Sequence, residues 1–97
     1  MKRIPLNQGD KIKLNNREYT IDTVIGDGAT CVVYSGYYYD NRNHRHYVNI
    51  KECYPYNADI TRESQKLNWR SEEEKTIAFD NFNFAYDNSA NDYRMQR

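Results

Sequence analysis

Residues 26–39 read GDGATCVVYSGYYY, a glycine turn followed by a run of β-branched and aromatic residues. This density of Val and Tyr favours an extended strand over a helix. The glycines are therefore predicted to join two strands, whereas the glycine loop of a dinucleotide-binding fold leads into a helix. A Walker-type phosphate loop needs Gly-Lys followed by Ser or Thr, and no such tripeptide occurs in the chain.

Further strands are predicted on both sides of this unit. Polar and apolar residues alternate on either side of Asn15-Asn16, a pair that tolerates the positive φ of a tight turn, so a leading hairpin is expected over 10–26. A polar turn over 40–43 precedes another strand over 47–53. That strand is expected to end at Tyr54-Pro55, because proline cannot extend a central ladder.

The rest of the chain predicts a loop and one helix. Residues 57–69 are polar without periodicity, which indicates a loop. Ser71 and Glu74 fit a capping box, and apolar residues then recur at helical spacing, so a helix is predicted over 71–95. Four asparagines weaken this helix, and a break or fraying is expected. The expected class is α+β, with an antiparallel sheet of a hairpin and two further strands packed by one C-terminal helix.

Composition restricts the class of protein. The 14 basic and 14 acidic residues give a net charge of +0, which supplies no electrostatic footprint for nucleic acid. No apolar run approaches the roughly 20 residues of a membrane span, and no secretory signal is recognised. Cys31 and Cys53 are interpreted as reduced thiols of a cytoplasmic protein. Leu, Ile, Val and Phe account for only 17 of 97 residues, so the ten Tyr are expected to supply core volume.

Two motifs resemble the small lobe of protein kinases. Gly26 to Tyr34 is similar to the kinase signature G-x-G-x-x-G-x-V-Y, with Cys31 in place of the third glycine, and residues 48–51 resemble its V-A-I-K strand. Residues 51–55 also resemble a Lys-Glu-hydrophobic-aromatic-Pro run of bacterial serine/threonine kinases. The resemblance covers roughly residues 6–90, so residues 1–97 are expected to form one partial domain, the N-terminal small lobe of such a kinase.

The resemblance implies an ATP site on one face of the predicted sheet. Lys51 would anchor the α- and β-phosphates, because alternation directs it to the cleft if Val48 and Ile50 face the core. Val33 would cover the adenine ring beside Asn49, a position where the family usually has Ala. The loop residues expected to line the nucleotide are Ile25, Gly26, Asp27, Gly28, Ala29, Thr30 and Cys31.

Other parts of a kinase site have no clear counterpart. Active kinases pair the lysine with a helix glutamate, and that position falls near Ser89, with Asp87 as one alternative. The H-R-D-x-x-x-x-N and D-F-G motifs are absent, so this chain alone is expected to transfer no phosphate. The Mg²⁺ ligands and the protein substrate would belong to a missing C-lobe. His44 and His46 make a poor metal site, and no metal ligands are assigned.

Two other functions stay open at this point. The chain could be a pseudokinase module that binds a nucleotide or a partner protein without chemistry. It could also be a β-rich module that binds single-stranded nucleic acid through its Tyr cluster with Arg42, Arg45 and Lys51, although the neutral charge argues against this. A small lobe separated from its partner lobe exposes apolar surface and a sheet edge, so self-association is expected.

Overall fold

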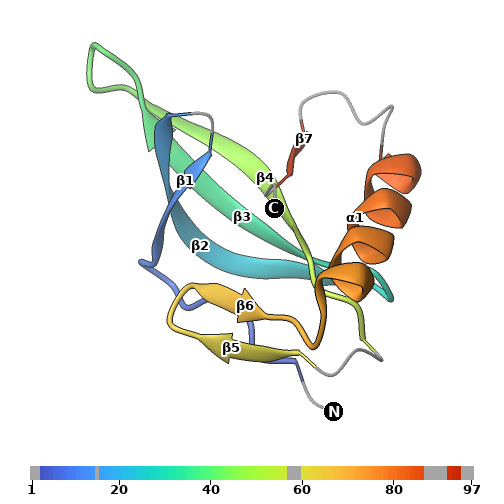
Figure 1. The fold of residues 1–97 in the computed structure, drawn as a ribbon. Coiled ribbons are helices and arrows are strands. Elements are labelled where there is room, and N and C mark those ends of the chain that lie inside the picture. Colours follow the sequence, from blue (N-terminus) through green and yellow to red (C-terminus); the bar gives the residue numbers. More distant parts are fainter. Residues whose placement is uncertain (1–2, 15, 57–59, 87–91, 95–97) are drawn as a thin grey trace.

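The glycine turn joins two long antiparallel strands, as predicted. We analysed a computed structural model that describes residues 3–14, 16–56, 60–86 and 92–94 (Figure 1). Strand β2 (Arg17–Asp27) pairs with β3 (Cys31–Tyr39), and irregularities interrupt their register between 21 and 23 and between 24 and 26. Each irregularity leaves one extra residue on β2, which is the arrangement of a β-bulge.

Four strands form the antiparallel part of the main sheet, in the order β1-β2-β3-β4. Strand β1 (Lys11–Leu14) pairs with β2, and β4 (Arg45–Cys53) pairs with β3 along nine residues. Two left-handed asparagines make the connecting turns, Asn16 and Asn43, each with φ of 66°. The expected antiparallel sheet of a hairpin and two further strands is therefore confirmed, with β4 beginning two residues before the predicted strand.

Gly36 lies where β3 passes closest to its neighbours. A Cβ at this position would lie 2.8 Å from Ile50 Cδ1 and 2.8 Å from the carbonyl oxygen of Thr20. The second of these atoms belongs to the backbone and cannot move aside without shifting β2. Glycine at this position therefore permits the tight packing of three strands.

The predicted loop over 57–69 is wrong, because part of it forms a second, two-stranded sheet. Strands β5 (Thr61–Glu63) and β6 (Lys66–Asn68) pair through a tight turn in which Ser64 has φ of 56°. The hairpin lies below the main sheet in Figure 1 and packs Leu67 against its core. Strands of three residues are too short to show an alternating pattern, and tertiary packing stabilises them instead.

The predicted helix over 71–95 is too long. Helix α1 (Glu72–Tyr86) begins as expected, with the Glu74 amide donating to Ser71 Oγ at 3.1 Å. Residues 92–94 instead form strand β7 (Asp92–Arg94), which pairs in parallel with β4 and extends the sheet to five strands. Asparagine has low helix propensity, and the exposed edge of β4 offers backbone hydrogen-bonding groups to a strand.

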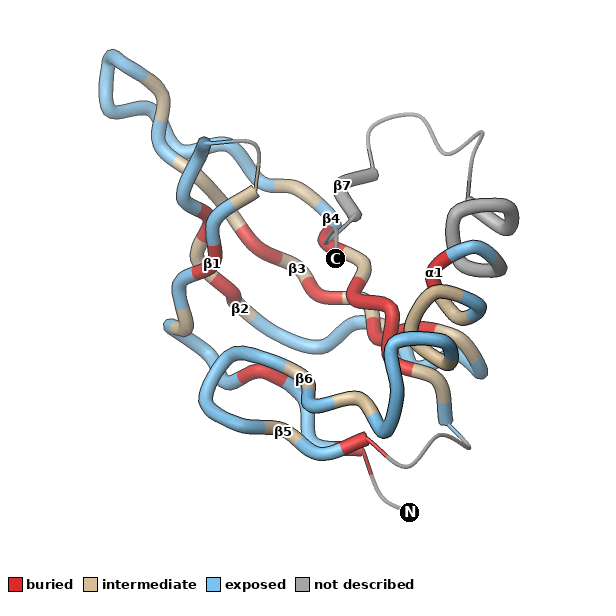
Figure 2. Tube along the Cα trace, in the orientation of Figure 1, coloured by how far each residue is buried: buried red, intermediate tan, exposed pale blue. Residues whose placement is uncertain are grey.

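Tyrosine rings supply much of the core, as predicted from the small number of Leu, Ile, Val and Phe residues. Tyr34 and Tyr54 are almost fully buried, with 0% and 1% exposed, beside Ile21 and Ile50. The buried stretches follow the sheet, and the hairpin tip of β3 and β4 is exposed (Figure 2). In the described ranges we find no helix long and apolar enough to cross a membrane.

Candidate functional site

Strand register aligns three of the predicted site residues in one row across the sheet. Val33 of β3 stands opposite Gly26 of β2 on one side and opposite Lys51 of β4 on the other. Residues directly opposite each other in antiparallel strands direct their side chains to the same face. The backbone of the glycine turn, an apolar side chain and an ammonium group therefore share one face of the sheet.

Burial along β4 follows the alternation expected from the sequence. Ile50 and Glu52 are buried and Val48 packs against the same core, whereas Asn49 is exposed and Lys51 is half-buried. Lys51 and Asn49 therefore project from the face opposite this core. Val48 and Ile50 face the core, as the alternation predicts, and the position of Lys51 relative to a nucleotide cleft stays a prediction.

Helix α1 covers the glycine-turn end of the sheet. Phe79 of the helix forms a buried cluster with Cys31 and Cys53, and Val33 and Trp69 pack against it. Both thiols are reduced and only 1% exposed. Burial, followed by the proximity of Cys31 and Glu52, raises the pKa of the Cys53 thiol to about 12. Cys53 is therefore protonated near neutral pH and serves as an apolar packing group.

The glycine turn is held by backbone hydrogen bonds to the segment after β4. The amide of Gly28 donates to the carbonyl oxygen of Cys31 at 3.0 Å. The carbonyl oxygens of Thr30 and Ala29 accept from the amides of Tyr54 and Tyr56 at 3.0 and 2.9 Å. The turn and the residues that follow the lysine strand therefore form one connected unit.

Arg3 is a residue of the site that the sequence analysis did not identify. Its buried guanidinium donates to the carbonyl oxygens of Gly28, at 2.7 Å, and Tyr54, at 2.8 Å, and forms an ion pair with Asp27. The predicted loop residue Asp27 is thus neutralised by a charge 24 positions away in the chain. A basic residue near the start of a sequence carries no pattern that indicates such a contact.

A buried polar network lies beneath the lysine strand. The Arg62 guanidinium donates two hydrogen bonds to the Glu52 carboxylate, at 2.6 and 2.8 Å, and Tyr34 OH donates a third at 2.8 Å. Burial, followed by the neighbouring Glu52 charge, raises the pKa of Tyr34 well above its ordinary value. Alternation along β4 places Glu52 on the core face with Ile50, and a carboxylate there needs a buried cation.

The N-terminal segment is attached to this network and to the second sheet. The amide of Leu6 donates to Tyr34 OH, and the amide of Ile4 donates to Tyr54 OH, both at 3.0 Å. Arg62 Nε donates to the carbonyl oxygen of Ile4 at 2.9 Å. Residues 4–6 therefore connect the core of the sheet to β5.

The remaining predicted site residues are distributed as follows. Ile25, at a β-bulge, is 54% exposed, and Ala29 and Thr30 lie in the turn itself. Asp87 and Ser89, the expected partners of Lys51, lie outside the residues that the structure describes. Within the described ranges, no group of three or more His, Cys, Asp or Glu side chains is arranged to hold a metal ion.

A tyrosine–arginine patch occupies the other end of the same sheet face. We define it as Tyr37, Tyr39, Arg45 and Tyr47. The Arg45 guanidinium lies 4.5 Å from the ring centroid of Tyr37 and donates to the hydroxyls of Tyr39 and Tyr47, at 2.6 and 3.1 Å. Tyr47 is 63% exposed. The patch therefore presents aromatic surface to solvent near the tip of β3 and β4.

Comparison with known proteins identifies no relative. No protein-family model matches the chain, and neither a curated protein nor a solved structure is significantly similar to it.

Proposed function

We propose that the chain is the ATP-binding small lobe of a serine/threonine-type protein kinase. The 26–31 turn would cover the nucleotide phosphates and Lys51 would anchor them. The observation that carries the proposal is the row of Gly26, Val33 and Lys51 across β2, β3 and β4. A nucleotide along this row would meet turn backbone, the part of Val33 that the Phe79 cluster leaves exposed, and an ammonium group, which suit its phosphates and base.

Electrostatics at the turn support an anionic ligand. Asp27 is the acidic residue of the 26–31 turn, and its carboxylate forms an ion pair with Arg3. The paired arginine reduces the repulsion between Asp27 and an approaching phosphate. Gly28 has space around its Cα, since an added Cβ would lie 3.9 Å from the nearest atom, the carbonyl oxygen of Cys31. Ligand atoms can therefore approach the backbone at this position.

The test is an ATP titration of the ¹⁵N-labelled chain, followed by amide chemical shifts. We expect saturable shifts in residues 26–31 and at Lys51, and their loss in Lys51→Ala. Lys13→Ala removes an exposed lysine of β1 and is the matched control. The proposal fails if ATP leaves the turn amides unmoved at millimolar concentration, or if Lys51→Ala binds as tightly as the wild type.

A second variant separates binding from stability. Gly28→Ala adds one methyl group in open space, so we expect the urea midpoint to change little. The same methyl group would obstruct the approach of phosphate to the turn, so we expect weaker ATP binding. Equal ATP affinity in Gly28→Ala and the wild type would contradict a phosphate position at this turn.

Phosphate transfer lies outside the proposed activity of this chain. The sequence contains neither H-R-D nor D-F-G, which supply the catalytic base and a Mg²⁺ ligand in kinases. We expect no phosphorylation of a protein substrate by the purified chain, measured with radiolabelled ATP. A pseudokinase module would give the same negative result. Intact H-R-D and D-F-G motifs in a companion C-lobe would favour a catalytic kinase over a pseudokinase.

The tyrosine–arginine patch favours a second candidate function, the binding of single-stranded nucleic acid. Exposed tyrosine rings beside an arginine can stack on bases without sequence preference. Anisotropy of a labelled oligothymidine would show salt-sensitive binding that Tyr47→Ala weakens and Lys51→Ala barely changes. No change in anisotropy at low ionic strength would eliminate this candidate.

A further inference from the structure

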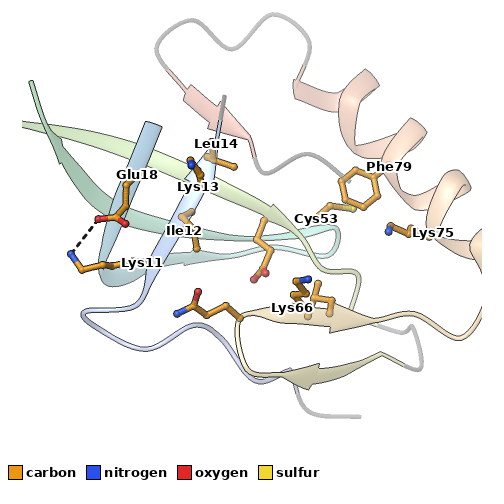
Figure 3. Close-up of a pocket in the computed structure, with 12 residues that line it drawn as sticks. Lys11, Ile12, Lys13, Leu14, Glu18, Cys53, Lys66, Lys75 and Phe79 are labelled. Atoms are coloured by element: carbon orange, nitrogen blue, oxygen red, sulfur yellow. Dashed lines mark ion pairs between the residues drawn. The ribbon is translucent and has the colours of Figure 1, made fainter. Parts of the chain in front are cut away.

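A cleft of about 580 Å³ opens between β1, β6, the end of β4 and α1 (Figure 3). Its volume falls in the range of small-molecule sites in proteins. The residues that line it include Ile12 and Glu52, which belong to the core side of the main sheet, and include neither Lys51 nor any residue of the 26–31 turn. The cleft therefore shares no residue with the proposed nucleotide site, although Cys53 and Phe79 in its wall pack with Cys31 and Val33 of that site.

Apolar and basic side chains line this cleft together. Ile12, Leu67 and Phe79 come from three different elements and supply carbon surface. Lysines from the same three elements, together with a second lysine of β1, surround that surface: Lys11, Lys13, Lys66 and Lys75. Figure 3 shows Lys66 and Lys75 extending from β6 and α1 towards the space between these elements. A ligand in the cleft would meet an apolar wall and ammonium groups at once.

Positive charge exceeds negative charge among the residues that line the cleft, which include four lysines but only two glutamates, Glu18 and Glu52. Glu18 is paired with Lys11 at 3.6 Å, and Glu52 is buried against Arg62. Among the residues that the structure describes, Lys13, Lys66 and Lys75 form no ion pair. Since the whole chain has a net charge of +0, this is a local excess of positive charge. Charge complementarity therefore selects an anion.

We propose that the cleft binds a small amphipathic carboxylate, with the carboxylate group at Lys66 and Lys75 and an acyl or aryl body against Ile12, Leu67 and Phe79. A short inorganic anion would leave the apolar wall uncovered, and a neutral apolar molecule would leave the ammonium groups without a partner. Both would therefore bind more weakly than a ligand that combines the two features.

Trp69 is a built-in reporter for this site. It is the single tryptophan of the chain, and its ring centroid lies 5.9 Å from that of Phe79, which lines the cleft. We expect laurate, added below its micelle concentration, to change Trp69 fluorescence saturably. Acetate, which has the head group alone, should have no effect at the same concentration. Dodecyltrimethylammonium, which has the same tail with a positive head, should bind at least about tenfold more weakly.

Charge-reversal variants distinguish laurate binding in this cleft from non-specific attraction of laurate to the protein surface. Lys66→Glu and Lys75→Glu should each weaken laurate binding at least about tenfold. Arg42→Glu makes the same change in net charge at the exposed β3–β4 turn and should leave laurate binding unchanged. Circular dichroism verifies that each variant folds, and Leu67→Ser tests the apolar wall in the same titration.

Three outcomes would overturn the proposal. The first is a linear, unsaturable response to laurate. The second is equal weakening by Lys66→Glu and Arg42→Glu. The third is binding to phosphatidylglycerol vesicles without binding to free laurate, because this result would assign the lysines to a membrane surface. ATP binding provides an independent check, since Lys66→Glu should leave the ATP-induced shifts of residues 26–31 intact.

Discussion

Glu52→Gln removes one charge from the buried pair with Arg62 and keeps the size of the side chain. The guanidinium then remains in the core without a counterion, because the side chains of Glu52 and Arg62 are only 4% and 6% exposed. Breaking a buried pair by removing one partner costs about 3–5 kcal/mol of unfolding free energy. A loss of that size lowers the ratio of folded to unfolded protein by roughly two to four orders of magnitude.

The surface pair of Arg70 and Glu74 is a matched control. Its closest nitrogen and oxygen atoms are 2.6 Å apart, the same distance as in the buried pair, but its side chains are 66% and 38% exposed. Exposed pairs contribute about 0.2–1 kcal/mol, because water screens both charges. Glu74→Gln should therefore change the unfolding free energy several-fold less than Glu52→Gln.

The assay is urea unfolding of four variants of each pair, followed by circular dichroism. The variants of the buried pair are the wild type, Glu52→Gln, Arg62→Met and the double variant. We expect the costs of the two single substitutions to sum to more than the cost of the double substitution, because either single substitution leaves a buried charged group without its partner. The difference, which is the coupling energy, should be at least about 2 kcal/mol. The reasoning is refuted if Glu52→Gln and Glu74→Gln have unfolding free energies within about 0.5 kcal/mol of each other.

Three further predictions concern packing and pH. Gly36→Ala should destabilise the fold by about 1–3 kcal/mol in urea unfolding, because the added Cβ meets a backbone oxygen at 2.8 Å, and a value below that of Gly28→Ala would contradict this. Burial raises the pKa of Cys53 from 9.0 to about 12, so the thiol keeps its proton to higher pH in the folded state than in the unfolded state. The unfolding free energy should therefore fall above pH 9, by at most about 1.4 kcal/mol per pH unit. Cys53→Ala should flatten that slope. The hydrogen bond from His46, followed by the His44 amide, lowers the pKa of Asp40 below 3.8, so its contribution to the β3–β4 turn is present above that pH and is lost as the pH falls through the lowered value. Amide shifts of the turn should record this loss, and their persistence in Asp40→Asn would exclude Asp40 as its source.

The strands around the glycine turn could be predicted because their cause is local. Alternating burial along residues 47–53 reflects one core face and one open face, and that pattern is visible in the residue types themselves. The same pattern places Asn49 and Lys51 on a common face. The positions of the two hairpin turns set the register of β2, β3 and β4. That register aligns Gly26, Val33 and Lys51.

The elements that were missed depend on contacts distant in sequence. Strands β5 and β6 have three residues each and are stabilised by Arg62 reaching Glu52 and by Leu67 entering the core. Strand β7 needs the free edge of β4, which no local pattern reveals. Arg3 has partners at positions 27, 28 and 54, so its role appears only when the chain is folded.

The attachment of the N-terminal segment has a consequence for the order of folding during synthesis. Residues 3–6 are synthesised before their partners, because Arg3 bonds to a residue 51 positions later and Ile4 to one 58 positions later. The hairpins of β1, β2 and β3 have neighbouring partners and can pair as soon as they emerge. Residues 3–6 cannot complete their hydrogen bonds until Arg62 has been synthesised, and until then their amides are hydrated. We expect their docking to be a late step of folding on the ribosome, and a bulky fusion at the N-terminus to delay that step more than the pairing of the sheet.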